Sequence, residues 1–381
     1  MTRILFLLFI GMIFISCKET KKNENIIEND VSKLEFKIDS LFGKHYPENG
    51  PAAAILVTYK GENIIKKAYG LRNIDNKEKA TNSTNFRSAS LAKQFTALGI
   101  LSLIQENKLK LTDSVYKYLP YSIFEDVTIE QLISHTSGIE DAEYIFENQW
   151  ASKDYVTLDS IIDWYKENDI SRFKPGTKFE YNNGGYYVLT KIIELVSQDS
   201  FSEYINDVVF DRIGMNDTRY VNSNNIGRIP EMAVCYEKDS LGNWNSKENN
   251  YLNILVGAGG IYTNLNDYSK YLGALRNQNI LDKSTHELIF KPMSMNIELH
   301  SQDMSVLKDK ESSYTMGWEV TDSLAVSAGS YYGVNNWSIF GLNEPLSLII
   351  LTNNDILFKE KLVDKTYEII TKNTTANNVY N

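Results

Sequence analysis

The stretch Ser90-Leu91-Ala92-Lys93, which follows Phe86-Arg87-Ser88-Ala89, places a hydroxyl and an amine three residues apart. It opens a segment, reaching Ile104, whose apolar residues occupy nearly the whole helical circumference, and this is typical of a buried helix. Residues i and i+3 share a helix face, so the Lys93 amine can approach the Ser90 hydroxyl. The pattern therefore predicts a serine and a lysine together at the start of a buried helix.

This pairing is chemically useful because a serine hydroxyl is a weak nucleophile unless a base lies beside it. A lysine can be that base when burial or nearby cations disfavour its charge. The free N–H groups at a helix N-terminus also favour a nearby anion. Two other interpretations stay open from the pair alone, since serine is a good N-cap and a lysine can extend its amine from an apolar helix to the solvent.

Three further stretches add weight to the catalytic interpretation. Tyr181-Asn182-Asn183 supplies a Tyr-x-Asn, and Leu132-Ile133-Ser134-His135-Thr136-Ser137-Gly138 lies between it and the serine. Gly329-Ser330-Tyr331-Tyr332-Gly333 opens a strand-like stretch near the C-terminus. In this order and at these intervals, from about residue 49 to about residue 354, the set resembles the serine β-lactamase and penicillin-binding-protein superfamily. The resemblance is to its class C branch, which also holds esterases, D-aminopeptidases and DD-carboxypeptidases.

The resemblance implies a role for each motif residue. Ser90 would be the nucleophile, and Lys93 and Tyr181 would move protons between the nucleophile, the leaving group and water. Asn183 would bind Lys93 and the amide of the substrate's acyl side chain. The backbone amides of Ser90 and Ser330 would hold the oxyanion. Plainer roles remain for two of them, because the chain has 24 tyrosines that mostly serve packing, and the Asn-Asn-Gly-Gly stretch of residues 182–185 suits a turn.

The third motif departs from the superfamily pattern. Relatives carry lysine or histidine, any residue, then glycine at the start of this strand, whereas this chain has Ser327-Ala328-Gly329. A neutral hydroxyl replaces the cation that would bind a substrate carboxylate, although Ser327 could still donate a hydrogen bond there. Acyl-enzyme chemistry stays plausible, but efficient β-lactam hydrolysis is not expected. His135 could act as a general base, and we interpret it as a structural residue of a loop near the cleft.

The N-terminus predicts export and a lipid anchor. Arg3 precedes an apolar segment of residues 4–15, and Ser16-Cys17 follows, which is typical of a secretory signal peptide. The segment is shorter than the roughly 20 apolar residues of a membrane span. Residues 14–17 resemble a bacterial lipoprotein cleavage site, so Cys17 is predicted to carry the lipid and to anchor the protein in the bacterial envelope, facing the periplasm or the surface. A plain signal peptide or an uncleaved anchor are the alternatives.

Composition excludes several other functions. A formal net charge of −10 argues against nucleic-acid binding, which needs a basic face. The four histidines and two cysteines show no metal-binding spacing, so no metal and no cofactor are expected. With Cys17 acylated no disulfide can form within the chain, and Cys235, in an apolar setting, is expected to be a buried structural thiol.

The organisation predicts residues 1–17 as signal peptide, 18–30 as polar linker and 31–375 as one hydrolase domain with a helical subdomain at roughly 90–250. Strands are expected at 52–59 and 62–69, joined by a hairpin, and at 314–320, 324–327, 334–340 and 346–352. Helices are expected near residues 31–42, 91–104, 186–196, 267–275 and 357–370. The fold class is therefore α/β of the α+β type, with one antiparallel sheet built from both ends of the chain, helices against it and an inserted helical part.

The sequence thus predicts a lipid-anchored serine hydrolase that forms an acyl-enzyme from a small-molecule or peptide ester or amide. Two alternatives remain: a D-amino-acid peptidase or carboxypeptidase on cell-wall peptides, and a non-catalytic lipoprotein that binds wall fragments or β-lactams. Substrate selectivity is expected from the loops of residues 140–160, 221–250 and 290–310.

Overall fold

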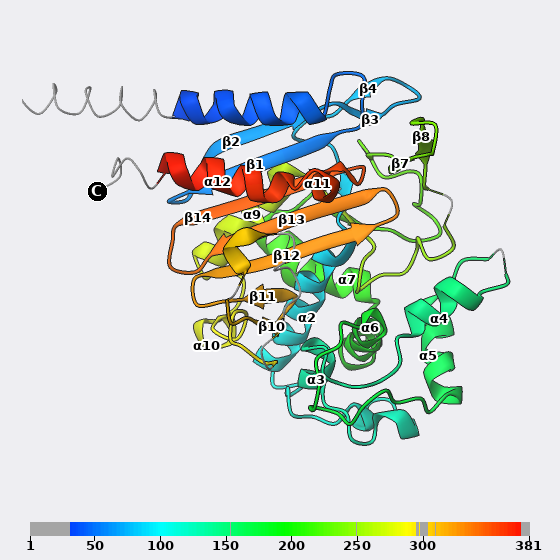
Figure 1. The fold of residues 1–381 in the computed structure, drawn as a ribbon. Coiled ribbons are helices and arrows are strands. Elements are labelled where there is room, and N and C mark those ends of the chain that lie inside the picture. The colour runs from blue at the N-terminus through cyan, green and yellow to red at the C-terminus, as the bar shows by residue number, and fades with distance from the viewer. Residues whose placement is uncertain are drawn as a thin grey trace, which may run out of the picture.

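The computed structural model describes residues 31–374 except 153, 249, 295–296, 298–303 and 309. Its centre is a seven-stranded antiparallel sheet in the order β10-β11-β12-β13-β14-β1-β2 (Figure 1). The sheet strands are β1 Ala53–Tyr59, β2 Glu62–Tyr69, β10 Ser313–Thr315, β11 Trp318–Val320, β12 Leu324–Tyr331, β13 Val334–Gly341 and β14 Leu346–Thr352. Because β14 pairs with β1, strands from the N-terminal and C-terminal parts of the described chain lie side by side in one sheet, and the predicted fold class is confirmed.

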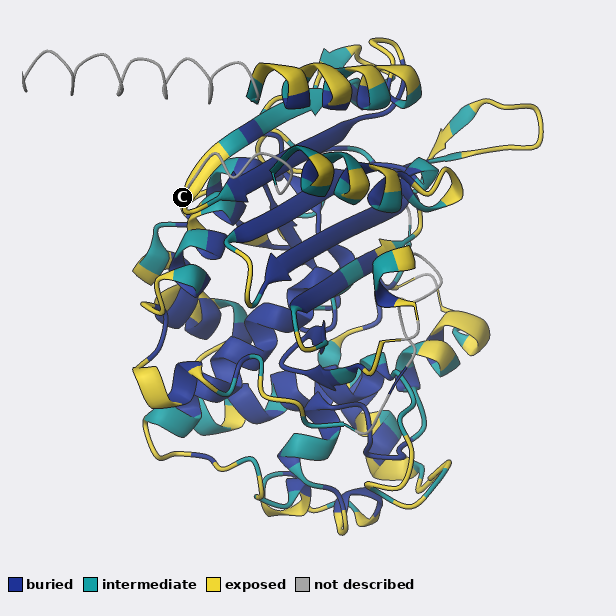
Figure 2. Ribbon diagram, turned by 60° about the vertical axis from the view of Figure 1, so that its left-hand side comes forward, coloured by how far each residue is buried: buried dark blue, intermediate teal, exposed yellow. Residues whose placement is uncertain are grey.

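The two faces of the sheet are covered by different helices. Strand side chains alternate between faces, so Ala53, Ile55 and Val57 pack with the helix of residues 31–45 and with α12 (Leu362–Thr374). Ala54 and Leu56 face the opposite way, into the core that holds α2 and α9. Figure 2 shows the consequence: the central strands are buried on both sides, while the outer helices each keep an exposed face.

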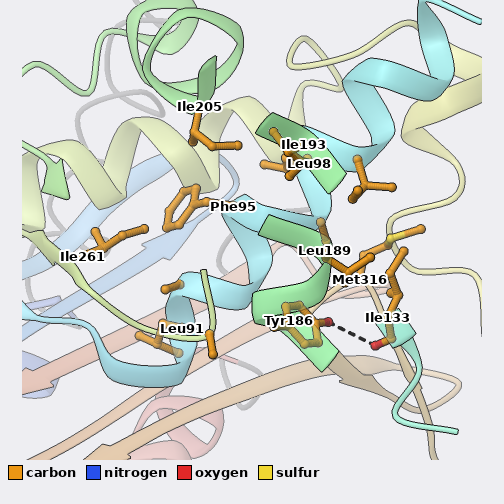
Figure 3. Close-up of a cluster of buried hydrophobic side chains, with 14 of the residues drawn as sticks. Leu91, Phe95, Leu98, Ile133, Tyr186, Leu189, Ile193, Ile205, Ile261 and Met316 are labelled. Atoms are coloured by element: carbon orange, nitrogen blue, oxygen red, sulfur yellow. Dashed lines mark hydrogen bonds between the residues drawn. The ribbon is translucent and has the colours of Figure 1, made fainter. Parts of the chain in front are cut away.

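The helical part lies between the short strands β5 and β9 in the chain and groups around two central helices. Every residue of α2 from Lys93 to Leu103 is buried, as predicted for a helix that is apolar all round. Figure 3 shows α2 and α6 side chains, among them Phe95 and Ile193, in one cluster, where the Tyr186 hydroxyl donates to the Ile133 carbonyl at 3.1 Å. The core therefore fixes the start of α2, where Ser90 lies, against α6.

The remaining elements are short or peripheral. The helices of the helical part and around it are η1 Ala89–Ala92, α2 Lys93–Gln105, η2 Val115–Lys117, η3 Ser122–Phe124, α3 Ile129–Ile133, α4 Ala142–Gln149, α5 Leu158–Glu167, α6 Asn183–Ser197, α7 Phe201–Ile205, η4 Asn206–Phe210, α8 Asp211–Ile213, α9 Leu265–Arg276, α10 Lys283–His286, η5 Ser305–Leu307 and α11 Ile356–Lys359. The small strands are β3 Leu71–Asn73, β4 Glu78–Lys79, β5 Phe86–Arg87, β6 Arg219–Tyr220, β7 Tyr236–Lys238, β8 Trp244–Ser246 and β9 Ile261–Thr263.

Most predicted elements are confirmed, including the hairpin at Lys60-Gly61, where both residues have positive φ as a tight two-residue turn requires. Three boundaries are wrong. The strand expected at 314–320 is split into β10 and β11 by Gly317, whose φ of +82° interrupts the strand. The C-terminal helix is split near Lys361, which also has positive φ, and β12 continues to Tyr331 instead of ending at Ser327.

Residues 1–17 and 18–30, predicted as signal peptide and linker, lie outside the described residues, and the division of the rest at about 90 and 250 stays a prediction. In the described part of the chain, no helix combines the length and the apolar character that a membrane crossing requires.

Candidate active site

Ser90 lies on a strained turn between β5 and α2. Ala89 has a φ of +49°, a left-handed conformation that alanine rarely adopts, and it begins the short helix η1. Ser90 is the second residue of this turn, so its backbone N–H has no partner within the helix. The turn therefore presents both the hydroxyl and the N–H of Ser90 at the start of a buried helix.

Lys93 is fully buried one turn later and donates three hydrogen bonds. Its Nζ lies 3.1 Å from Ser90 Oγ, 2.7 Å from Asn183 Oδ1 and 3.0 Å from the carbonyl of Ala258. An ammonium has three N–H donors and no acceptor, so this set uses its capacity fully. The interpretation of Lys93 as a surface lysine is therefore wrong, because burial is tolerated only with such partners.

Asn183, which contacts Lys93, is the first residue of α6. Asn182 caps this helix through the N–H of Gly185 at 2.9 Å, and Asp141 from the start of α4 accepts the N–H groups of Asn183 and Gly184 at 3.1 and 2.9 Å. The Asn183 Nδ2 donates to Glu143 Oε1 at 2.8 Å. Because one end of the amide must donate and the other accept, these two partners together fix Asn183 with its oxygen toward Lys93.

Tyr181 lies beside the same ammonium. Lys93 Nζ is 4.9 Å from the centre of the Tyr181 ring, and that ring packs against His135 with centroids 4.3 Å apart. His135 is buried, and its Nδ1 accepts the N–H of Asn182 at 3.2 Å. Burial lowers the pKa of His135 well below its ordinary value, and the charge of Lys93 adds to this effect. The neutral imidazole thus supports the backbone that carries Tyr181, and it does not line the pocket at Ser90.

Ser330 directs its backbone N–H toward the serine turn. The N–H and carbonyl of Asn335 both bond to Thr352 Oγ1, at 3.2 and 2.5 Å, so they point toward β14. Ser330 is the partner of Asn335 in the β12–β13 register, and in an antiparallel pair its N–H must then point away from β13. The β11 pairings reach β12 only at Ala325 and Val326, which leaves this edge open toward η1 at Ser330.

Gly329 allows β12 to approach that turn closely. A Cβ at this position would lie 2.4 Å from the Ser88 carbonyl oxygen and 3.1 Å from the Ser90 nitrogen. No other residue fits without moving the strand, so glycine is required here for packing rather than for its φ. Ser90 and Ser330 both line the same pocket, so their N–H groups are the candidate pair of donors for an oxyanion hole.

Ser327 is placed differently from the other motif residues. It is 4% exposed, and its Oγ donates to the Gly317 carbonyl at 2.9 Å. The Ser327 hydroxyl is therefore occupied by an intramolecular hydrogen bond, and Ser327 is not among the residues that line the pocket. Lys308 and Lys310, which lie in the 290–310 region, are not among them either.

A small pocket of about 50 Å³ opens at Ser90. Its wall includes Asn183 and Ser330 from the predicted site, together with Glu143 and Arg87, to which the sequence motifs gave no role. Of the three loops expected to govern selectivity, the first contributes Glu143 to this wall, and the other two contribute none of the lining residues. The complete lining is Arg87, Ala89, Ser90, Glu143, Asn183, Tyr187, Leu252, Leu255, Ala258, Gly259, Gly260, Ser330 and Tyr331.

The two charged residues of the wall are held in different ways. Burial raises the pKa of Glu143 to about 7, and the nearby carboxylate of Asp141 adds to the rise. Arg87 is 5% exposed, its Nε donates to the Tyr262 hydroxyl at 3.1 Å, and its guanidinium lies 5.0 and 5.3 Å from the rings of Tyr262 and Tyr331. The pocket therefore contains one carboxyl group that titrates near neutral pH and one enclosed cation.

Cys235 lies behind this wall, buried against Ala89 and Val334. Burial raises the pKa of its thiol well above the ordinary value, and nearby Glu248 adds to this, so the reactive thiolate is disfavoured. In the described ranges no group of His, Cys, Asp and Glu side chains is arranged to hold a metal ion. The chemistry that this arrangement offers is thus a hydroxyl, a lysine, a tyrosine and two N–H groups.

Comparison with known proteins finds similarity over most of the chain. The family model described as Beta-lactamase matches residues 43–371. Penicillin-binding protein 4* of Bacillus subtilis (strain 168) is 27% identical over 343 residues, which are 86% of this chain and 73% of that protein. Protein flp of Staphylococcus aureus (strain N315) is 34% identical over 201 residues, 49% of this chain and 38% of that protein.

Solved structures share the fold. A D-amino acid amidase from Ochrobactrum anthropi SV3 superposes with a TM-score of 0.75 and 21% identity, covering 89% of this chain and 99% of its own. EstCE1, a hydrolase with promiscuous acyltransferase activity, superposes with a TM-score of 0.74 and 17% identity, covering 91% of this chain and 99% of its own. The octameric penicillin-binding protein homologue from Pyrococcus abyssi superposes with a TM-score of 0.72 and 24% identity, covering 86% of this chain and 74% of its own.

Proposed function

This chain belongs to the beta-lactamase family, and from that premise we propose that it hydrolyses esters or amides through an acyl-enzyme on Ser90. The family, together with the amidase and the hydrolase among the structures that share its fold, supports a serine hydrolase in general. The observation that carries the specific proposal is the approach of Lys93 Nζ to Ser90 Oγ at 3.1 Å, beside two backbone N–H groups.

Each step has a group in place. Ser90 Oγ forms a bond to the substrate carbonyl carbon, and its proton passes into the pair of Lys93 and Tyr181. An ammonium and a phenol together have no site for this proton, so the reactive form of the pair holds one proton fewer. Either Tyr181 is a phenolate beside the Lys93 ammonium or Lys93 is a neutral amine beside the phenol, and the Ser90 proton restores the ammonium and the phenol. The carbonyl oxygen becomes an oxyanion between the N–H groups of Ser90 and Ser330.

The intermediate then expels the alcohol or amine, which takes up the proton, and leaves an ester on Ser90. Water adds to that ester, the same pair receives its proton, and Ser90 is regenerated as the acid is released. Asn183 holds Lys93 in place through the 2.7 Å contact and presents its other face to the pocket. No step requires a cofactor.

The test compares Ser90→Ala with the matched control Ser88→Ala, which removes a buried hydroxyl two residues away. Ser90→Ala should abolish labelling by a fluorescent fluorophosphonate and lower ester hydrolysis by about 10⁴-fold or more, as removal of a catalytic serine does. Ser88→Ala should keep both. A folded Ser90→Ala protein with substantial turnover would remove this serine from the mechanism, and absence of labelling in the wild type would favour a non-catalytic binding protein.

A second candidate is a peptidase or carboxypeptidase acting on D-amino-acid peptides of the cell wall. It is favoured by the similarity to penicillin-binding protein 4* over 86% of the chain and by the D-amino acid amidase among the structures that share the fold. The mechanism above serves both candidates, because only the leaving group differs. A panel that pairs short-chain esters with D-alanyl peptides distinguishes them.

The cellular location is also a proposal. An apolar segment of residues 4–15 followed by Ser16-Cys17 supports a lipoprotein whose Cys17 carries the lipid and which faces the periplasm or the cell surface. The substrate would then be a small molecule or peptide of the envelope.

A further inference from the structure

Among the described residues that line the pocket, Glu143 is the one with an acidic side chain. It comes from the first turn of α4 and lies next to Asn183, which contacts Lys93, which contacts Ser90. A carboxyl group is therefore placed in the wall of the same pocket as the proposed nucleophile. Catalysis as described above makes no use of it.

The orientation of this carboxyl group is fixed by two donors. Asn183 Nδ2 donates to Oε1 at 2.8 Å, and the Tyr187 hydroxyl donates to Oε2. An ionised carboxylate offers about four acceptor positions and no donor, so these two bonds leave acceptor capacity that is open to the pocket. The site can thus bind a group that donates, and a positively charged donor best of all.

The charges around Glu143 leave it without a dedicated cation. No ion pair of Glu143 occurs among the described residues, and Arg87 on the same wall is enclosed by two tyrosine rings. Asp141 and burial disfavour the ionised form, which is why the pKa of Glu143 is about 7. The titratable groups whose charge or hydrogen bond acts on it are Lys93 of α2, Asp141 and Glu147 of α4, Tyr165 of α5, Tyr187 of α6 and Tyr331 of β12.

We propose that Glu143 is a specificity residue that binds a protonated amino group on the acyl part of the substrate, close to the scissile carbonyl. The substrate class is then an amino acid ester or amide, or a short peptide with a free N-terminus. The inference rests on the proposed acyl-enzyme function, because it uses Ser90 to place the acyl group.

The experiment compares two isosteric substrates, alanine methyl ester and methyl isobutyrate, in which a methyl group replaces the ammonium. Values of kcat/KM are measured for both, with D- and L-alanine esters, in the wild type and in Glu143→Gln. Glutamine keeps the shape and an acceptor for Asn183 but loses the charge. The preference for the amino ester should fall about ten- to a hundredfold, the range expected for a charge-assisted hydrogen bond. The difference in intrinsic reactivity between the two esters cancels, because the same pair of esters is compared in the wild type and in the variant.

The matched control is Glu147→Gln, on the same helix but exposed and bonded to Tyr332 outside the pocket wall. It should not lower the preference, because loss of the Glu147 charge favours the ionised form of Glu143. If Glu143→Gln lowers kcat/KM equally for both esters, Glu143 acts only by orienting Asn183, and the inference is overturned. Equal use of both esters by the wild type, after correction for their reactivity in water, overturns it as well.

Failure of this inference is distinguishable from failure of the proposed function. Fluorophosphonate labelling of Ser90 in the wild type reports on the function alone, because the probe carries no amino group for Glu143 to bind. Binding of alaninamide and isobutyramide to Ser90→Ala, measured by calorimetry, tests amine recognition without turnover. Tighter binding of alaninamide that is lost in the Ser90→Ala, Glu143→Gln double variant supports the inference, and equal binding of the two amides contradicts it.

Discussion

Replacement of Gly329 by alanine tests how strictly the oxyanion site depends on the approach of β12 to the serine turn. The added Cβ would lie 2.4 Å from the Ser88 carbonyl oxygen, and contacts shorter than 3.0 Å do not occur, so the strand must retreat by 0.6 Å or more. Ser330 is the next residue, and its N–H moves with the strand. A displacement of this size weakens or removes one oxyanion donor, which costs about 10²- to 10³-fold in kcat.

The assay is steady-state hydrolysis of a neutral short-chain ester, with the fluorophosphonate labelling rate and thermal unfolding measured on the same samples. Gly273→Ala is the matched control, because it lies in α9 with no atom within 4 Å of the added Cβ. The control should keep full activity. If folded Gly329→Ala retains activity within about threefold of the wild type, the Ser330 N–H is not part of the oxyanion site as described, since loss of a donor costs far more than that.

Three further outcomes are expected. Glu143→Gln should leave the free energy of unfolding unchanged at about pH 4 and raise it by at most about 3 kcal/mol at pH 8, because a carboxyl group whose pKa is raised from 4.5 to about 7 destabilises the folded state as the pH rises through that range; identical pH profiles in denaturant titrations would contradict this. Ser327→Ala should cost about 1–3 kcal/mol by leaving the Gly317 carbonyl unpaired, with kcat/KM for a neutral ester unchanged; a large loss of activity in a stable variant would place this hydroxyl in the reaction. Cys17→Ala should stop lipid attachment, so mass spectrometry should find a diacylglycerol-modified N-terminus in the wild type only, and an unmodified start downstream of Cys17 would mean an ordinary secreted protein.

The part of the site that was predicted from sequence is the part encoded by short spacing. Ser90 and Lys93 are one helical turn apart, so their contact follows once the segment is a helix. Asn183 is distant in the chain and was placed beside Lys93 by the superfamily resemblance, since nothing in its local sequence indicates that contact. The alternation of apolar residues also predicted the strands of the sheet, because each face of the sheet packs against a helical layer.

Glu143 was missed because its signal is tertiary. In the sequence it belongs to Glu140-Asp141-Ala142-Glu143, which is what a solvated helix start contains. Only the docking of α4 against the N-terminus of α6 turns it toward Asn183 and Tyr187 and raises its pKa. Arg87 was missed for a related reason, because the rings that enclose it come from β9 and β12.

The errors in element boundaries have a backbone cause. The apolar pattern continues through Gly317 and Lys361, and a side-chain period cannot report a change in φ. Gly317 must turn there because it packs against the start of α2, where a Cβ would be 2.6 Å from the Gln94 nitrogen. The same glycine supplies the carbonyl that accepts the Ser327 hydroxyl, so the local break and the placement of Ser327 have one origin.

The central claim is that Ser90 carries the acyl group during turnover. The most direct measurement is intact-protein mass spectrometry on samples quenched with acid during hydrolysis of a p-nitrophenyl ester, followed by peptide mapping. We expect a mass increase equal to one acyl group, located on the peptide that contains Ser90 and absent in Ser90→Ala. Turnover with no acylated species under rapid quench, or an acyl group on another residue that persists in Ser90→Ala, would contradict it.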